Sequence, residues 1–221
     1  GLCLVGSEMC IRDRLDHENY SFELVLPVLD RMDEAGIPLV VNTSKTRAEW
    51  LAMRGEFGNF DPYIVENGSA IYDGEKVEIF GVSRAEILDF LKSLRAKFKF
   101  KGYSDVGVSE IMQWTGLGRL SAERSADRHF SEPLVWQDSP EKESEFCEFV
   151  KERGLGTLRG GRFLHVLGQT DKGKPLQYFR KEKVAIIALG DRANDLAMLE
   201  AADIGIIIKA PSNYVLSLIH I

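Results

Sequence analysis

The sequence predicts an α/β protein whose parallel sheet is interrupted by an inserted α+β module. Short, continuously apolar runs such as Pro38–Val41 and Val184–Leu189 alternate with helical patterns, and polar side chains follow the end of each run. Apolar strands that alternate with helices are typical of a parallel sheet covered on both faces. A change of pattern between Gly81 and Leu167, where helices mix with several short strands, indicates the inserted module.

The elements of the first half follow one another in a regular order. Apolar residues near helical spacing end at Gly36, a suitable residue for a helix C-terminus. The patterns predict a helix over 21–36, a strand within 37–46, a helix over 47–57, and strands within 63–80 joined by Asn-Gly and Asp-Gly turns.

The second half contains the module and then returns to the first pattern. Within the module we expect a helix over 83–98, an irregular stretch over 109–132, strands over 133–138 and 162–168, and a helix over 141–154. A helix starting near Lys172, a strand over 183–189, a helix from Asn194 and a strand over 204–209 complete the sheet. The predicted boundaries are a core over 15–80 and 168–214, with a cap domain over 81–167.

Composition sets limits on the partners. The 221 residues are 44% hydrophobic, and 34 acidic side chains exceed 28 basic ones. This balance argues against affinity for nucleic acid or an anionic membrane, and an anionic substrate would need a locally basic site. No apolar run reaches spanning length and no secretory signal is recognisable, so we expect a cytoplasmic protein. The three cysteines form neither a disulfide framework nor a metal pair.

Both ends of the chain look foreign. Residues Glu8–Asp13 and Leu216–Ile221 can be back-translated into DNA strings that are reverse complements over almost their whole length. Such inverted ends are typical of a translated sequencing adapter. We therefore expect 1–14 and 215–221 to lie outside the natural sequence, which would be a fragment, and we expect the first core strand to be missing.

Two positions suit a phosphate group. Thr43, Ser44 and Lys45 follow a predicted strand and precede a helix, where hydroxyls, a cation and backbone N–H groups can hold an anion. Lys172 lies at a predicted helix start, where a cation is disfavoured unless an anion is near. Taken alone, each position is better explained without a ligand, by a helix-capping threonine beside a solvated lysine in the first case and by a surface lysine next to Lys174 in the second.

A third position suits a metal ion. Asp191, Asn194 and Asp195 follow the strand over 183–189 in the sequence GDRAND. Two carboxylates and an amide can bind Mg²⁺, which takes one or two protein carboxylates and keeps several waters. A helix-capping aspartate is the simpler alternative, but the preceding glycine and apolar strand favour the metal.

Taken in order, these residues resemble the haloacid dehalogenase superfamily of phosphatases, whose motifs are strand-Asp-x-Asp, strand-Thr/Ser, Lys and Gly-Asp-x-x-x-Asp. Within it, the chain is similar to mannosyl-3-phosphoglycerate phosphatases in the segments LDHENYSFE, NTSKTRAEW, ENGSAIY, WTGL, GRFLHVL and GDRANDLAMLE. The resemblance implies a Rossmann-like core, a cap that binds the sugar, and hydrolysis of a sugar phosphate through an aspartyl-phosphate. Glucosyl-3-phosphoglycerate or another phosphosugar is the alternative substrate.

The resemblance also implies roles for individual residues. Asp191 would ligate Mg²⁺ directly and Asp195 directly or through water, while Asn194 would orient the phosphate or a metal-bound water. Thr43 and Lys172 would hold the phosphoryl oxygens, with Ser44 and Lys45 beside them. In the cap, substrate-binding candidates are Gly161, Arg162 and His165, although a core strand with a satisfied histidine is nearly as good an explanation.

The nucleophile of the family has no counterpart in this chain. Asp13 and Asp16 have the wrong spacing for Asp-x-Asp and follow no apolar strand. We therefore expect the chain as printed to be inactive, and a protein that binds a phosphosugar without hydrolysing it is the alternative function. The sequence indicates nothing about the oligomeric state.

Overall fold

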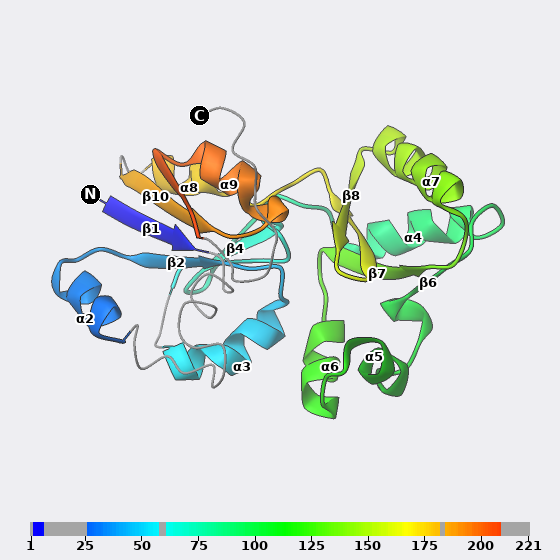
Figure 1. The fold of residues 1–221 in the computed structure, drawn as a ribbon, viewed down its shortest axis with the longest axis horizontal. Coiled ribbons are helices and arrows are strands. Elements are labelled where there is room, and N and C mark those ends of the chain that lie inside the picture. The colour runs from blue at the N-terminus through cyan, green and yellow to red at the C-terminus, as the bar shows by residue number, and fades with distance from the viewer. Residues whose placement is uncertain (1, 7–25, 58–60, 182–183, 209–221) are drawn as a thin grey trace.

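The computed structural model describes residues 2–6, 26–57, 61–181 and 184–208, and their strands form two sheets (Figure 1). The strands and helices in the first half are β1 (Leu2–Gly6), α2 (Leu26–Glu34), β2 (Leu39–Asn42), α3 (Arg47–Phe57), β3 (Tyr63–Val65), β4 (Ala70–Asp73), β5 (Lys76–Ile79), α4 (Arg84–Leu94), β6 (Phe100–Gly102) and α5 (Val108–Thr115). The second half contains α6 (Arg119–Ala126), β7 (Ser131–Trp136), α7 (Pro140–Glu152), β8 (Leu155–Gly160), β9 (Phe163–Gly168), α8 (Leu176–Arg180), β10 (Ala185–Gly190), α9 (Leu196–Ala201) and β11 (Ile204–Ile207). Two single-turn 3₁₀ helices are η1 (Tyr103–Asp105) and η2 (Ala193–Asp195).

The larger sheet has the order β11-β10-β1-β2-β3-β4-β5. From β11 to β3 all neighbours are parallel, and β4 and β5 continue the sheet as antiparallel strands. Helices α8 and α9 pack on one face around Leu176 and Met198, whereas Trp50 of α3 and Met32 of α2 pack on the other. The predicted α/β class with a parallel-sheet core is confirmed.

The prediction that the first core strand is missing is wrong. Leu2–Gly6 forms β1, which pairs in parallel with β10 on one side and β2 on the other. Its sequence, LCLVG, has no polar–apolar alternation, and a central parallel strand needs none because it is covered on both faces. Cys3 and Val5 are 2% and 0% exposed on the α8–α9 side. The other residues expected to be foreign, 1, 7–14 and 215–221, lie outside the described part of the chain.

The smaller sheet is antiparallel and has the order β6-β7-β9-β8. Helices α4 and α7 pack against it through Leu91 and Phe146, in a cluster separate from the core of the larger sheet. The stretch 109–132, expected to be irregular, instead contains most of α5 and all of α6. These helices pack together around Ile111 and Ala122.

The carboxylate of Glu66, on the loop between β3 and β4, joins the two sheets. It is 1% exposed and accepts hydrogen bonds from the backbone N–H groups of His129 and Phe130 at 2.8 and 3.2 Å. It also accepts one from the Ser131 hydroxyl at 2.5 Å. Because these donors lie at the start of β7, the smaller sheet is fixed over the edge of the larger one where β2 and β10 end.

Candidate active site

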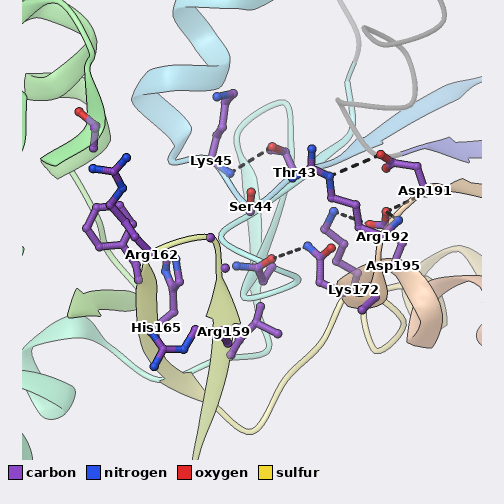
Figure 2. Close-up of a pocket in the computed structure, with 18 residues that line it drawn as sticks. Thr43, Ser44, Lys45, Arg159, Arg162, His165, Lys172, Asp191, Arg192 and Asp195 are labelled. Atoms are coloured by element: carbon purple, nitrogen blue, oxygen red, sulfur yellow. Dashed lines mark hydrogen bonds and ion pairs between the residues drawn. The ribbon is translucent and has the colours of Figure 1, made fainter. Parts of the chain in front are cut away.

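Side chains from three loops meet where the parallel strands of the larger sheet end. Thr43 follows β2 and Asp191 follows β10, and these two strands flank β1, while Lys172 lies on the segment that returns from β9. Their side chains converge on one cavity of about 760 Å³ (Figure 2). The carboxyl ends of parallel strands are the usual place for a ligand in such a sheet.

Thr43 is held by its own backbone and by its neighbours. Thr43 is 1% exposed, and its backbone N–H donates to the carbonyl of Ile64 at 2.9 Å. The Thr43 hydroxyl oxygen accepts a hydrogen bond from the N–H of Lys45 at 3.1 Å. This turn places the hydroxyl of Thr43 at the cavity wall, with Ser44 and Lys45 beside it (Figure 2).

Lys172 and Asp195 form a buried ion pair. The ammonium nitrogen lies 2.7 Å from Oδ1 of Asp195, and the two side chains are 4% and 1% exposed. Oδ2 of Asp195 accepts hydrogen bonds from the N–H groups of Asp191 and Arg192, both at 3.1 Å. Both oxygens of Asp195 are therefore engaged within the site. Gly190 allows this arrangement, because a Cβ at that position would lie 2.6 Å from Cβ of Asp195.

The metal-binding prediction can be tested against these donors. Within the described residues, no group of three or more His, Cys, Asp or Glu side chains is arranged so that it could hold a metal ion by itself. Asp191 is 5% exposed and lines the cavity, with Nε of Arg192 3.5 Å from its Oδ2. The site therefore offers Asp191 as one carboxylate and Asp195 as a second one nearby. This set fits Mg²⁺, which takes one or two protein carboxylates and keeps several waters, better than Zn²⁺ or Ca²⁺, which take more protein ligands.

The opposite wall of the cavity comes from the hairpin of β8 and β9. Its turn includes Gly161, whose φ is +57°, and both Gly160 and Gly161 line the cavity. Arg162 follows on the exposed side of the turn, and His165 lies deeper on β9 (Figure 2).

Burial and the nearby charge of Arg128 lower the pKa of His165 to about 3, so its imidazole is neutral at physiological pH. Its Nδ1 has no hydrogen-bond partner among the described residues. This finding disfavours the alternative of a core histidine whose polar atoms are all satisfied. Trp114 does not line the cavity and packs against Tyr103 and Phe163, in the apolar cluster that also contains Ile111 and Ala122.

All ten predicted site residues line this one cavity: Thr43, Ser44, Lys45, Gly161, Arg162, His165, Lys172, Asp191, Asn194 and Asp195. The structure adds Asn67, Thr115, Arg159 and Arg192, which the sequence analysis did not single out. Arg159 could have been found from its symmetric place across the Gly-Gly turn from Arg162, whereas Asn67 was interpreted only as a turn residue. Arg159 also forms a close ion pair with Glu143.

Cations outnumber carboxylates in the cavity wall. Its charged side chains are Lys45, Arg159, Arg162, Lys172, Arg192, Asp191 and Asp195. The chain as a whole has a formal net charge of −6, so this excess of positive charge is local. A protein with a negative net charge needs such a locally basic site to bind an anionic ligand.

Curated relatives of this chain are phosphatases. The chain is 37% identical over 218 residues to a glucosyl-3-phosphoglycerate/mannosyl-3-phosphoglycerate phosphatase from Persephonella marina, covering 88% of this chain and 80% of the relative. A protein of the same name from Methanococcoides burtonii is 34% identical, with 89% and 81% covered. The chain belongs to the glucosyl-3-phosphoglycerate/mannosyl-3-phosphoglycerate phosphatase family.

Solved structures give the same fold. A haloacid dehalogenase superfamily phosphatase from Bacteroides thetaiotaomicron matches with a TM-score of 0.68 at 18% identity, covering 92% of this chain and 82% of that one. A sugar phosphatase of subclass IIB of the superfamily matches with a TM-score of 0.66 at 16% identity, covering 91% and 85%. No family model matches the chain. In the described part of the chain, no helix combines the length and apolar character needed to cross a membrane.

Proposed function

We propose that the chain carries the phosphate-binding and charge-stabilising part of a magnesium-dependent phosphomonoesterase for a phosphosugar. The observation that carries this proposal is the convergence of Thr43, Lys172, Asp191 and Asp195 on one cavity with excess positive charge. The names of the curated relatives favour glucosyl-3-phosphoglycerate or mannosyl-3-phosphoglycerate as the substrate class. Both molecules combine a phosphate, a carboxylate and sugar hydroxyls.

The phosphate is assigned to the wall formed by the larger sheet. The hydroxyl of Thr43 and the ammonium of Lys172 face this part of the cavity and can hold phosphoryl oxygens. Charge that develops on these oxygens is best stabilised by donors fixed in advance, and the buried position of Lys172 provides such fixation. Ser44 and Lys45 lie beside them as weaker candidates.

Mg²⁺ is assigned to Asp191 as the direct protein ligand. Asp195 already accepts three hydrogen bonds within the site, so it orients its surroundings or acts through water. Asn194 lines the same wall and is assigned to orient the phosphate or a metal-bound water. When bound, the cation offsets the negative charge of the phosphate and polarises it.

The remote part of the substrate is assigned to the cap, which we place at 81–167. Arg162 can bind the glycerate carboxylate through two parallel hydrogen bonds, because its guanidinium is planar and always charged. The neutral His165 can donate to or accept from a sugar hydroxyl. Gly161 lets the ligand approach the backbone of the turn closely.

Turnover needs groups that the printed sequence lacks. It contains no Asp-x-Asp, the pair that in the superfamily supplies the nucleophile and the proton-transfer carboxylate. Asp13 and Asp16 lie outside the described residues. We therefore propose that this chain binds the ligand without hydrolysing it. The missing pair also favours the second candidate function, a phosphosugar-binding protein that is not an enzyme.

Calorimetric titration of the printed chain with inorganic phosphate tests the binding site. We expect phosphate binding that strengthens when Mg²⁺ is added, and Asp191→Asn should remove the effect of Mg²⁺ because the cation loses an anionic ligand. Asp89→Asn is the matched control, since this aspartate is 84% exposed and lies on α4 of the cap. Equal phosphate affinity with and without Mg²⁺ in all three proteins would contradict the proposal.

A further inference from the structure

Three consecutive residues between β3 and β4 adopt the left-handed backbone conformation. The φ angles of Glu66, Asn67 and Gly68 are +47°, +57° and +87°. L-residues rarely adopt this conformation, and asparagine is among those that tolerate it best. Such strain persists only where the surroundings hold it in place, and it is a reason to look for a function.

Asn67 contacts two elements of the phosphate site. Its N–H donates to the carbonyl of Thr43 at 3.0 Å. Its side-chain oxygen accepts a hydrogen bond from Nδ2 of Asn194 at 3.3 Å, across 127 residues of sequence. Asn67 is only 3% exposed, and it lines the cavity.

The same loop packs closely against a third element, the turn that carries Lys172. A Cβ on Gly68 would lie 1.9 Å from the backbone oxygen of Asp171. The Gly68 carbonyl also accepts a hydrogen bond from the hydroxyl of Thr170 at 2.9 Å. The loop is therefore fixed against the segments that carry Thr43, Lys172 and Asn194, all three of which are assigned to the phosphate.

A turn alone does not explain this arrangement. An Asn-Gly pair is common in turns, and the backbone conformation would account for Asn67 if its side chain pointed to solvent. The side chain is instead buried and bonded to a residue on η2, a contact that the turn does not require.

We infer that Asn67 is a positioning residue that orients the carboxamide of Asn194 toward the bound phosphate. One N–H of Asn194 is engaged by Asn67, which leaves its second N–H to donate to a phosphoryl oxygen. This inference rests on the proposed function, since it assumes that phosphate binds in this cavity. Asn67 acts through Asn194 and is not assigned a contact with the reacting atoms.

Asn67→Gly tests the inference, because glycine accepts the φ of +57° and removes only the side chain. In the printed chain with Mg²⁺, we expect the affinity for inorganic phosphate to fall roughly five- to tenfold, with little change in the midpoint of thermal unfolding. Asn194→Ala should weaken phosphate binding at least as much. If Asn67 acts through Asn194, the double variant should bind phosphate no more weakly than Asn194→Ala alone.

Ser69→Ala is the matched control, because it removes a hydrogen bond to Glu66 O within the same loop without touching Asn194. Phosphate affinity should be unchanged in this variant. The inference is overturned if Asn67→Gly binds phosphate like the parent, if Ser69→Ala weakens binding equally, or if the effects of Asn67→Gly and Asn194→Ala simply add. A parent chain that binds no phosphate would overturn the proposed function itself, and this inference with it.

Discussion

Replacing Lys172 by methionine should destabilise the protein strongly and weaken phosphate binding. The change removes the positive charge but keeps a side chain of similar length. Asp195, which is 1% exposed, then loses the partner that lies 2.7 Å from its Oδ1. Breaking a buried ion pair by removing one partner costs about 3–5 kcal/mol, since the remaining charge stays buried.

The lower end of that range applies to Asp195. Its second oxygen keeps the hydrogen bonds from the N–H groups of Asp191 and Arg192. A loss of about 3 kcal/mol corresponds to a fall in the unfolding midpoint of roughly 6–12 °C for a chain of this size. Phosphate affinity should fall at least tenfold, because a charge-assisted hydrogen bond contributes about 1.5–3 kcal/mol.

Lys174→Met provides the control for this experiment. Lys174 lies two positions away and is exposed, with its ammonium 3.3 Å from the carbonyl of Gln169. Its replacement should change stability by less than about 0.5 kcal/mol. Thermal unfolding followed by circular dichroism and titration with phosphate measure both effects. Equal unfolding midpoints for the two variants would refute the assignment of a stabilising buried ion pair to Lys172.

Three further predictions concern other parts of the structure. Gly68→Ala should destabilise the protein more than Gly74→Ala in urea unfolding: both sites have positive φ, but a Cβ at Gly68 meets a backbone oxygen at 1.9 Å and one at Gly74 meets nothing within 4 Å. Equal losses would mean that the β3–β4 loop is not closely packed. Folding lowers the pKa of His165 from 6.5 to about 3. The free energy of unfolding should therefore have its full value above pH 6.5 and decline as the pH falls from 6.5 toward 3, because the unfolded chain then binds a proton that the folded protein does not. The decline should be at most about 1.4 kcal/mol per pH unit and absent in His165→Gln, and a decline of the same size in that variant would assign it to other groups. Arg162→Ala should leave the affinity for inorganic phosphate unchanged but lower that for 3-phosphoglycerate roughly thirty-fold in calorimetry, and equal losses for both ligands would place Arg162 in the phosphate site or the fold.

Much of the core could be predicted because its signals are local. The helix over 47–57 matches α3 residue for residue, and the apolar runs became β2, β10 and β11. The convergence of Thr43 and Asp191 followed from one rule, since parallel strands end at the same edge of a sheet.

Other features depended on contacts that are distant in sequence. β1 was not predicted because Leu2–Gly6 becomes a strand through its pairing with β10 and β2, which are distant in sequence, and not through a polar–apolar alternation of its own. Helices α5 and α6 are each only eight residues long and are separated by Gly116 and Gly118. Two turns are too few to show a clear helical period of apolar residues, so the sequence alone predicts an irregular stretch there. The bond between Asn67 and Asn194 joins residues that no local pattern connects.

The most direct test of the account is phosphate release from mannosyl- or glucosyl-3-phosphoglycerate with Mg²⁺. It compares the printed chain with a variant that carries an Asp-x-Asp-x-Thr sequence between Gly6 and Leu15, in place of residues 7–14. We predict no release by the printed chain, Mg²⁺-dependent release by the variant, and loss of that release when Asp191→Asn is added. Turnover by the printed chain at the rate of the variant would contradict the account, because it would show that the nucleophile is already present.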